Sequence, residues 1–273
     1  MVDDLRRGEC RMKLGVNIDH IAVLREARKI NDPSPLDAVG VCRIAGADQI
    51  TIHLREDRRH IHDNDARDII NSSLLPVNLE CSINPEIIDI VCTLKPFRAT
   101  LVPENRNEVT TEGGLDLSGQ YEKIKKAIDK LKANEIEISL FIDPSIQACD
   151  YAKMLGSDWV EFHTGSFANI YAMLYTNLRL THHCIKELDL PKSELKSKLD
   201  KSIKELETAS KEAYGLGLHV AAGHGLNYNN INEILHIKEI IELNIGQSII
   251  ARSVYVGLEK AIVEMRKILN FKF

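Results

Sequence analysis

Short apolar runs alternate with amphipathic stretches along the chain. The runs of strand length are Leu14–Asp19, Gln49–Leu54, Val77–Cys81, Ala99–Val102, Glu137–Ile142, Trp159–His163, His219–Ala222 and Ile240–Ile245. The stretches with helical spacing are Pro35–Ala45, Asp65–Leu74, Pro85–Leu94, Ser118–Asn134, Ser145–Leu155, Lys192–Tyr214 and Gly257–Leu269. Eight strands alternating with helices in 273 residues predict an α/β fold, a (β/α)8 TIM barrel with extra helices. A doubly wound open sheet would share the alternation, but no G-x-G-x-x-G follows the first strand.

Within the predicted strands, apolar residues occupy alternate positions, as expected for faces that helices cover. The opposite positions, which would point into the barrel, are mostly polar. They are Asn17, Asp19, His53, Arg55, Asn78, Glu80, Thr100, Asp143, Glu161, His163, Glu242 and Asn244. Buried charges are costly unless they are paired or used. We therefore expect these side chains to form an active site at the C-terminal end of the barrel.

The predicted domain organisation is one barrel, residues 13–273, preceded by an N-terminal extension, residues 1–12. Met12 could equally be the start of translation. The polar loop Glu104–Gly119 is long enough to cover an active site. The segment 166–214 is too long for one crossover and predicts a helical insertion. In it, Lys192–Tyr214 has mixed charge and leucines at Leu195, Leu199 and Leu206, which indicates either a solvated amphipathic helix or a subunit contact.

Composition narrows the possible partners. With 35 basic and 40 acidic side chains the net charge is −5, which argues against nucleic acid or an anionic membrane as a partner. The apolar runs are too short to span a bilayer. Six scattered cysteines without a C-x-x-C motif indicate free thiols in a reducing compartment, and the polar N-terminus lacks a signal peptide. We expect a cytoplasmic protein.

Two features indicate a phosphorylated ligand. The run HLREDRRH (His53–His60) is rich in arginine and histidine, and it is either an anion-binding rim or a salt-bridged loop. The segments AAGHGLN (Ala221–Asn227) and NIGQS (Asn244–Ser248) place glycine turns after the seventh and eighth strands. Barrel enzymes often bind phosphate with these two loops and a following helix N-terminus.

Glu80 and Glu161 on the inner face are candidates for a general base and an electrostatic stabiliser, because burial raises a carboxyl pKa toward neutrality. The alternative is that they are structural carboxylates neutralised by Arg55 or by histidines. His163 could orient Glu161 or only support the fold. No metal-binding spacing is present, so we expect no metal. The residues thus predict acid–base chemistry on a small phosphorylated substrate.

Eight segments together resemble the pyridoxine 5′-phosphate synthase family over nearly the whole chain. They are GVNIDHIAVLREAR, ITIHLREDRRHIHD, NLE, LVPENRNEVTTEGGLD, SLFID, EFHTG, AGHGLN and ELNIG. The resemblance implies a barrel enzyme of vitamin B6 biosynthesis, without metal or organic cofactor, that assembles as a homo-octamer (a tetramer of dimers). It implies condensation of 3-amino-2-oxopropyl phosphate with 1-deoxy-D-xylulose 5-phosphate to give pyridoxine 5′-phosphate, phosphate and water.

The resemblance also implies residue roles. His53 and Glu80 match the catalytic bases, His224 the proton donor, and Glu161 the carboxylate that stabilises charged intermediates. The residues that would contact 1-deoxy-D-xylulose 5-phosphate are Asp19, His20, Arg55, His60 and Thr110. The residues that would contact the aminoketone phosphate are Asn17, Arg28, Gly225, Gly246 and Gln247. Gln247 stands where a histidine is expected, so this contact would lack a charge.

Two other functions remain open from the residues themselves. One is another phosphosugar-processing barrel enzyme, an isomerase or an aldolase. A Schiff-base aldolase needs a lysine at an inner strand end, and none of the predicted strand ends carries one. The other is a non-catalytic metabolite-binding barrel, in which we would expect a titratable group to be missing from the site.

Overall fold

Eight parallel strands close into a barrel in chain order, β1 next to β2 and so on to β8 beside β1. The computed structural model describes residues 11–104 and 113–270. The strands are β1 (Lys13–Asn17), β2 (Gln49–His53), β3 (Val77–Cys81), β4 (Arg98–Leu101), β5 (Glu137–Ile142), β6 (Trp159–His163), β7 (His219–Gly223) and β8 (Ile240–Ile245). The (β/α)8 barrel predicted from the sequence is therefore confirmed.

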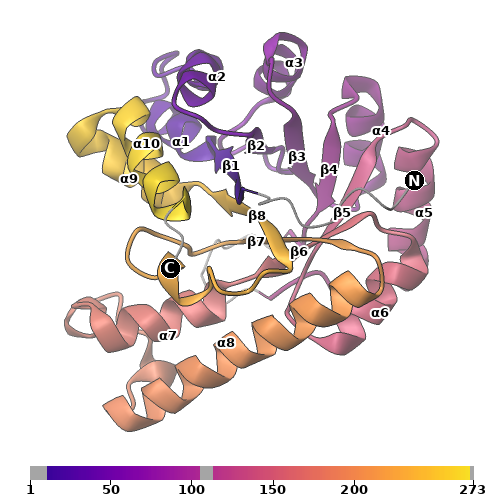
Figure 1. Cartoon of the computed structure of the whole chain (residues 1–273). Coiled ribbons are helices and arrows are strands. Elements are labelled where there is room, and N and C mark those ends of the chain that lie inside the picture. The colour runs from indigo at the N-terminus through magenta and orange to yellow at the C-terminus, as the bar shows by residue number, and fades with distance from the viewer. Residues whose placement is uncertain (1–10, 105–112, 271–273) are drawn as a thin grey trace.

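Helices surround the barrel on its outside (Figure 1). They are α1 (Asp19–Arg28), α2 (Pro35–Ile44), α3 (Asp63–Ser72), α4 (Pro85–Leu94), α5 (Tyr121–Lys132), α6 (Ile146–Leu155), α7 (Gly165–Tyr175), α8 (Lys192–Gly215), α9 (Gln247–Val256) and α10 (Leu258–Asn270), with short 3-10 turns η1 (Leu178–Leu180), η2 (Lys186–Leu188) and η3 (Ile231–Glu233). None of the helices in the described ranges has the length and apolar character needed to cross a membrane.

The core lies between the strands and the helices. The outward side chains of β2, Ile50 and Ile52, are fully buried, as are Leu79 on β3 and Leu140 on β5. Branched and long aliphatic residues suit this position because they pack on a pleated surface that helices cover. The alternation that predicted the strands thus corresponds to an apolar outer face.

The first strand is shorter than predicted. The expected strand Leu14–Asp19 ends at Asn17, and Asp19 is the first residue of α1. A single residue, Ile18, separates the two elements, so the apolar alternation runs on into the helix and hides the boundary. Helix α1 was not predicted, since it starts two residues after the end of β1, and α7 was predicted only as part of the helical insertion 166–214.

The predicted helical insertion consists of α7, η1, η2 and α8, and α8 lies along one side of the barrel next to α7 (Figure 1). Its leucines Leu195, Leu199 and Leu206 are buried within this single chain, in the same apolar cluster as the barrel core. These leucines therefore serve the core of this chain, and a subunit contact through the exposed face of the helix stays a prediction. The amphipathic character of the helix is confirmed, with one face buried and the opposite face exposed in the single chain.

Buried charges close the N-terminal end of the barrel interior. Arg98, the first residue of β4, donates from Nη1 to Glu242 Oε1 over 2.7 Å and from Nε to Glu137 Oε2 over 2.8 Å. Its guanidinium carbon lies 3.7 Å from the centre of the Trp159 ring. Glu242 was predicted to belong to the polar ring at the C-terminal end. It instead pairs in register with Lys13 at the start of β1, so it belongs to the opposite end.

The described cysteines Cys42, Cys81, Cys92, Cys149 and Cys184 are all free thiols, as predicted for that part of the chain.

Replacing Arg98 by methionine should lower the free energy of unfolding by about 3–5 kcal/mol, because it leaves the buried Glu242 carboxylate without its partner. Urea unfolding monitored by circular dichroism measures this loss. The double variant Arg98→Met/Glu242→Leu should recover much of it. Lys125→Met, which breaks the exposed pair between Lys125 and Asp129, serves as the control and should change stability little. A loss for Arg98→Met no larger than that of the control would contradict a stabilising role for the buried ion pair.

Candidate active site

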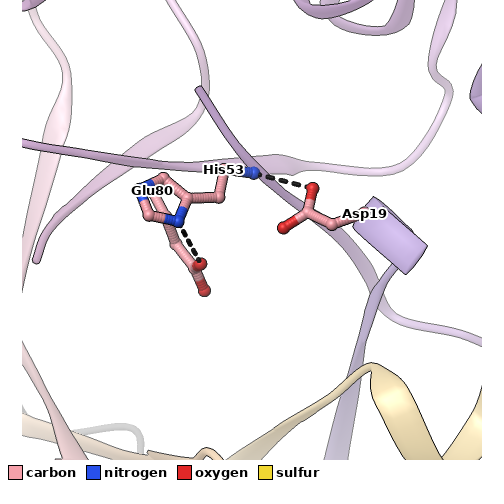
Figure 2. Close-up of side chains that lie close together, drawn as sticks. All are labelled: Asp19, His53 and Glu80. Carbon is pink, nitrogen blue, oxygen red and sulfur yellow. Dashed lines mark hydrogen bonds and ion pairs between the residues drawn. The ribbon is translucent and has the colours of Figure 1, made fainter. Parts of the chain in front are cut away.

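The C-terminal ends of β2 and β3 and the start of α1 bring three titratable side chains together (Figure 2). His53 ends β2 and lies in register with Glu80 of β3. The distance from His53 Nδ1 to Glu80 Oε2 is 3.9 Å. The backbone N–H of His53 donates to Asp19 Oδ1 over 2.9 Å, which ties α1 to the end of β2.

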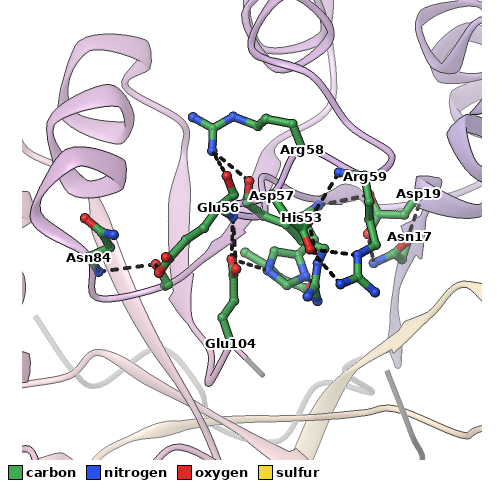
Figure 3. Close-up of polar contacts among 12 residues, drawn as sticks. Asn17, Asp19, His53, Glu56, Asp57, Arg58, Arg59, Asn84 and Glu104 are labelled. Atoms are coloured by element: carbon green, nitrogen blue, oxygen red, sulfur yellow. Dashed lines mark hydrogen bonds and ion pairs between the residues drawn. The ribbon is translucent and has the colours of Figure 1, made fainter. Parts of the chain in front are cut away.

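A fourth group, Glu104, lies on the other side of the imidazole. Its Oε1 is 3.4 Å from His53 Nε2, and both of its oxygens accept the Glu56 amide (Figure 3). Sequence reasoning assigned Glu104 only to a covering loop. The signal that could have found it is its position three residues after β4, at the same end of the barrel as His53. His53 therefore sits between two carboxyl groups, Glu80 and Glu104.

Three carboxyl groups of the site, those of Glu80, Glu161 and Asp19, have raised pKa values and are protonated more readily than free glutamate or aspartate. Burial, together with the negative charges of Glu161 and Asp19, raises the pKa of Glu80 well above its usual value. Burial raises the pKa of Glu161 to about 7, although a hydrogen bond from Asn244 acts against it. Burial also raises the pKa of Asp19, against the opposing effect of His53. A carboxyl group with a pKa near neutrality, as for Glu161, can both accept and donate protons at physiological pH.

Asp19, His53 and Glu80 could also hold a metal ion, since each offers one ligand atom and these atoms lie within 4.8 Å of one another. Binding a cation there would require Glu80 to lose the proton that its raised pKa favours. The raised pKa suits proton transfer better than metal ligation.

The end of β6 contributes two inner side chains. Glu161 is buried, and its Oε2 accepts from Asn244 Nδ2 on β8 over 2.7 Å. His163 pairs with Asp143, with its Nδ1 3.2 Å from Asp143 Oδ1, so the structure does not support an orienting role toward Glu161. The His163 ring is 4.9 Å from that of His224, edge to face.

His224 lies in the turn after β7 and has a left-handed backbone conformation. Its φ of +72° lies in the left-handed region. The Thr164 hydroxyl lies 2.8 Å from the carbonyl oxygen of Gly223 and 2.7 Å from that of His224, and it donates to this pair. Gly225 continues the turn with φ +89°, and its carbonyl accepts from the buried Asn230 amide over 3.0 Å. These contacts fix an exposed imidazole at the mouth of the barrel.

The turn after β8 lies against the end of β1. A Cβ on Gly246 would stand 2.9 Å from Asn17 Cβ, so only glycine allows this approach. Gln247 is the first residue of α9 and is exposed. Asn17 Nδ2 donates to Asp19 Oδ2 over 3.1 Å. The predicted contacts Asn17, Gly225, Gly246 and Gln247 therefore lie at or just after the C-terminal ends of β1, β7 and β8, beside a helix N-terminus that favours anions.

The arginine-rich run His53–His60 contains the ion pairs of a salt-bridged loop, and its role as an anion-binding rim stays a prediction. Arg58 pairs with Asp63, as in a salt-bridged loop. Arg59 pairs in the same way with Asp57 (Figure 3). Arg55 is buried, with its Nε 3.2 Å from Asp57 Oδ1, and His60 is buried near it in sequence. Arg55 and His60 thus remain the members suited to an enclosed anion.

Some predicted contacts are not brought to the site by this chain. Arg28 is exposed in the last turn of α1, and no interaction within residues 11–104 and 113–270 links it to the site. The buried arginine of that helix is Arg25, which pairs with Asp65. His20 is half-buried on α1, next to Asp19. Thr110 and half of the predicted covering loop, residues 105–112, lie outside the described residues.

Comparisons with known proteins agree with these features. The profile of the family "Pyridoxal phosphate biosynthesis protein PdxJ" matches residues 14–271. The pyridoxine 5′-phosphate synthase of Aliarcobacter butzleri is 71% identical over 259 residues, covering 95% of this chain and 99% of that protein. The enzyme of the same name from Sulfurovum sp. is 62% identical, covering 94% of this chain and 100% of that protein.

Solved structures with distant sequences share the fold. A 3-hexulose-6-phosphate synthase aligns with a TM-score of 0.57 at 13% identity, covering 94% of this chain and 99% of that one. A thiamine phosphate pyrophosphorylase from Pyrococcus furiosus aligns with a TM-score of 0.55 at 13% identity, covering 95% of this chain and 96% of that one. At this identity the likeness concerns the barrel alone.

The raised pKa of Glu80 predicts a pH-dependent cost of folding. The Glu80 carboxyl group binds its proton more tightly in the folded protein than in the unfolded chain. The stability that this proton contributes is complete below the pKa of Glu80 in the unfolded chain, and it is lost as the pH rises through the pKa in the folded protein. Glu80→Gln mimics the protonated acid, so it should match wild type near pH 4 and be more stable at pH 8. The gain should be roughly 1.4 kcal/mol for each unit between the two pKa values. Urea unfolding at both pH values measures this gain in stability.

Glu259→Gln, at an exposed position of α10, is the control. Equal stabilities of wild type and Glu80→Gln at pH 8 would refute a buried, proton-binding Glu80.

Proposed function

Because the chain belongs to the family of the pyridoxal phosphate biosynthesis protein PdxJ, we propose that it condenses 3-amino-2-oxopropyl phosphate with 1-deoxy-D-xylulose 5-phosphate to form pyridoxine 5′-phosphate, phosphate and water. The family and the enzyme class predicted from the sequence, a pyridoxine 5′-phosphate synthase of vitamin B6 biosynthesis, are confirmed by the family match and by relatives of 71% and 62% identity. The specific roles of the residues below are part of the proposal.

The observation that carries these roles is the cluster of His53 with Glu80 at adjacent strand ends, 3.9 Å apart between Nδ1 and Oε2. The reaction joins an amine to a carbonyl and expels water, so protons must be removed and returned in the same site. Glu80 removes a proton from the substrate, since burial makes its carboxylate more basic than a solvated one. His53 moves protons during loss of phosphate, with Glu80 and Glu104 on either side of its ring.

Glu161 and His224 have different roles, the first as an anion that stabilises positive charge and the second as a proton donor. The Glu161 carboxylate stabilises a positively charged imine-like intermediate, which is favourable in a buried site where few water molecules screen it. His224, exposed at the turn after β7, protonates the departing hydroxyl. Its backbone is fixed by Thr164, so the imidazole is directed without relying on a flexible loop.

Two anion sites hold the substrates so that their reacting carbons meet. Arg55, His60, Asp19 and His20 contact 1-deoxy-D-xylulose 5-phosphate, and Asn17, Gly225, Gly246 and Gln247 contact the aminoketone phosphate. Buried Arg55 and the N-terminus of α9 supply the favourable electrostatics. Such positioning accounts for up to roughly 7–11 kcal/mol of a barrier in favourable cases. Arg28 and Thr110 remain predicted contacts to the aminoketone phosphate and the deoxyxylulose phosphate respectively.

We further propose a cytoplasmic enzyme that works without metal or organic cofactor and assembles as a homo-octamer, a tetramer of dimers. The proton chemistry above uses only side chains of this chain, which supports the cofactor-free part. The five described cysteines are free thiols, in keeping with a reducing compartment.

Purified protein mixed with both substrates should form fluorescent pyridoxine 5′-phosphate and release phosphate, and a chelator should not reduce the rate. His53→Ala and Glu80→Gln should each lower kcat by about 10²–10⁴-fold, the usual contribution of a positioned acid or base. Ser202→Ala on α8, outside the proton-transfer cluster, is the control. Wild-type protein that binds both substrates and forms no product would overturn the proposed reaction. Trapping of either substrate by borohydride would favour a Schiff-base aldolase instead.

Sedimentation equilibrium should give a mass of about 246 kDa, eight times the 30.7 kDa chain. A single species of 30.7 kDa or of twice that mass would contradict the octamer. Measurement at several protein concentrations separates a stable octamer from a dissociating one, because only the latter changes its mean mass with dilution.

A further inference from the structure

A continuous chain of hydrogen bonds runs through the barrel interior from its N-terminal end to Glu161. Arg98 Nη1 donates to Glu242 Oε1 over 2.7 Å, and Gln49 Nε2 donates to the same oxygen over 3.2 Å. Gln49 Nε2 also donates to Asn244 Oδ1 over 3.4 Å. Asn244 Nδ2 then donates to Glu161 Oε2 over 2.7 Å. All five side chains are buried.

The chemistry of the groups fixes the direction of this chain. A guanidinium can only donate, so Glu242 must accept. Glu242 then requires the NH2 group of Gln49, and that same group requires the oxygen of Asn244. Thr51 Oγ1 reinforces this choice, since it also donates to Asn244 Oδ1, over 3.4 Å. The NH2 group of Asn244 is therefore left facing Glu161 Oε2, which accepts its hydrogen bond.

The backbone makes room for this arrangement on both sides. A Cβ on Gly15 of β1 would overlap Asn244 Oδ1, and a Cβ on Gly223 of β7 would overlap Glu161 Oε1. Any larger residue at either position would displace one end of the contact between Asn244 and Glu161. Gly15 and Gly223 are thus needed for the hydrogen bond between the Asn244 amide and the Glu161 carboxyl group.

The other charged groups around Glu161 come from three strands. Glu80 on β3 and Glu242 on β8 disfavour a second negative charge, whereas Arg98 on β4 favours it. His163, two residues further along β6, turns to Asp143. Burial is the largest influence on Glu161, so a donor aimed at its oxygen has a large effect on whether it is ionised.

We propose that Asn244 is a positioning residue that holds the Glu161 carboxylate as an anion facing the reaction, and that Arg98, Glu242 and Gln49 fix the orientation of its amide from the far end of the barrel. The inference rests on the proposed function in one respect, because it explains how Glu161 can stabilise a cationic intermediate. Without this donor the pKa of Glu161 would rise further, so a smaller fraction of the carboxyl group would carry the charge that the intermediate needs at neutral pH.

The test measures the pKa of Glu161 directly, by 13C NMR of protein labelled at the glutamate carboxyl carbon, with the resonance assigned by its absence in Glu161→Gln. Wild type should titrate at about 7. Asn244→Leu removes the donor, and it should raise the midpoint by about one pH unit or more. Gln49→Met leaves Asn244 in place and frees its amide to turn, so it should give a smaller rise in the same direction. The low-pH limb of kcat should move up with the NMR midpoint in both variants.

Thr100→Val is the matched control for the NMR midpoint, because Thr100 is equally buried inside the barrel but donates to Asn78 Oδ1 over 2.7 Å, outside this chain. It should leave the Glu161 midpoint unchanged. An unchanged midpoint in Asn244→Leu, or an equal rise in Thr100→Val, would overturn the proposal. An unchanged midpoint in Gln49→Met would overturn the orienting role of the chain.

The test gives a result even if Asn244→Leu does not fold, and it separates failure of this inference from failure of the proposed function. Should Asn244→Leu fail to fold, as judged by near-ultraviolet circular dichroism, Gln49→Met decides the outcome by itself. The NMR midpoints do not depend on turnover. A wild type that forms no product refutes the proposed function and leaves the NMR result standing, whereas an active wild type with unchanged midpoints refutes only this inference.

Discussion

The cost of placing charged groups inside a closed barrel governs the rest of this structure. Parallel strands covered by helices bury the inner face, where a charge without a partner is strongly unfavourable. At the N-terminal end the cost is met by pairing, because Arg98 bonds to both Glu137 and Glu242. At the C-terminal end Glu80 and Glu161 lie near each other, and their pKa values rise instead. The same constraint thus gives the barrel interior an N-terminal end with paired charges and a C-terminal end with carboxyl groups of raised pKa. The side-chain amides of Gln49 and Asn244 connect the two ends.

Much of the fold could be predicted from the sequence, because the outer face of each strand is apolar at alternate positions and the strands follow one another around the barrel. The level of each inner residue along the barrel axis could not be predicted in the same way. Glu242 and Asn244 are two residues apart on β8, yet one pairs with Arg98 and the other with Glu161. Only the register between strands separates these levels, and register is set by packing across the whole sheet. Arg98 was not recognised as part of the interior because the predicted fourth strand begins at Ala99, one residue after the start of β4.

Within the site, the residues at strand ends could be identified before the structure, and those that act through the backbone could not. His53, Glu80 and Glu161 follow from inner-face alternation. Thr164 was not identified, because its hydroxyl serves the carbonyl oxygens of a turn that is 59 residues further along the chain. Glu104 was taken as loop because its contact with His53 depends on how β4 ends beside β2 and β3. The barrel alone is shared with enzymes of other names at 13% identity, so the site residues and the family distinguish the function.

Catalysis is proposed to take place at the C-terminal mouth of the barrel, between the His53–Glu80 pair and the turns after β7 and β8. A crystal structure with 1-deoxy-D-xylulose 5-phosphate bound is the most direct measurement of this placement. We predict that the sugar carbons lie within reach of the His53 and Glu80 side chains, and that the phosphate contacts Arg55 and His60. A substrate bound away from the mouth of the barrel, or with its phosphate against other side chains and its carbons turned from Glu80, would contradict it.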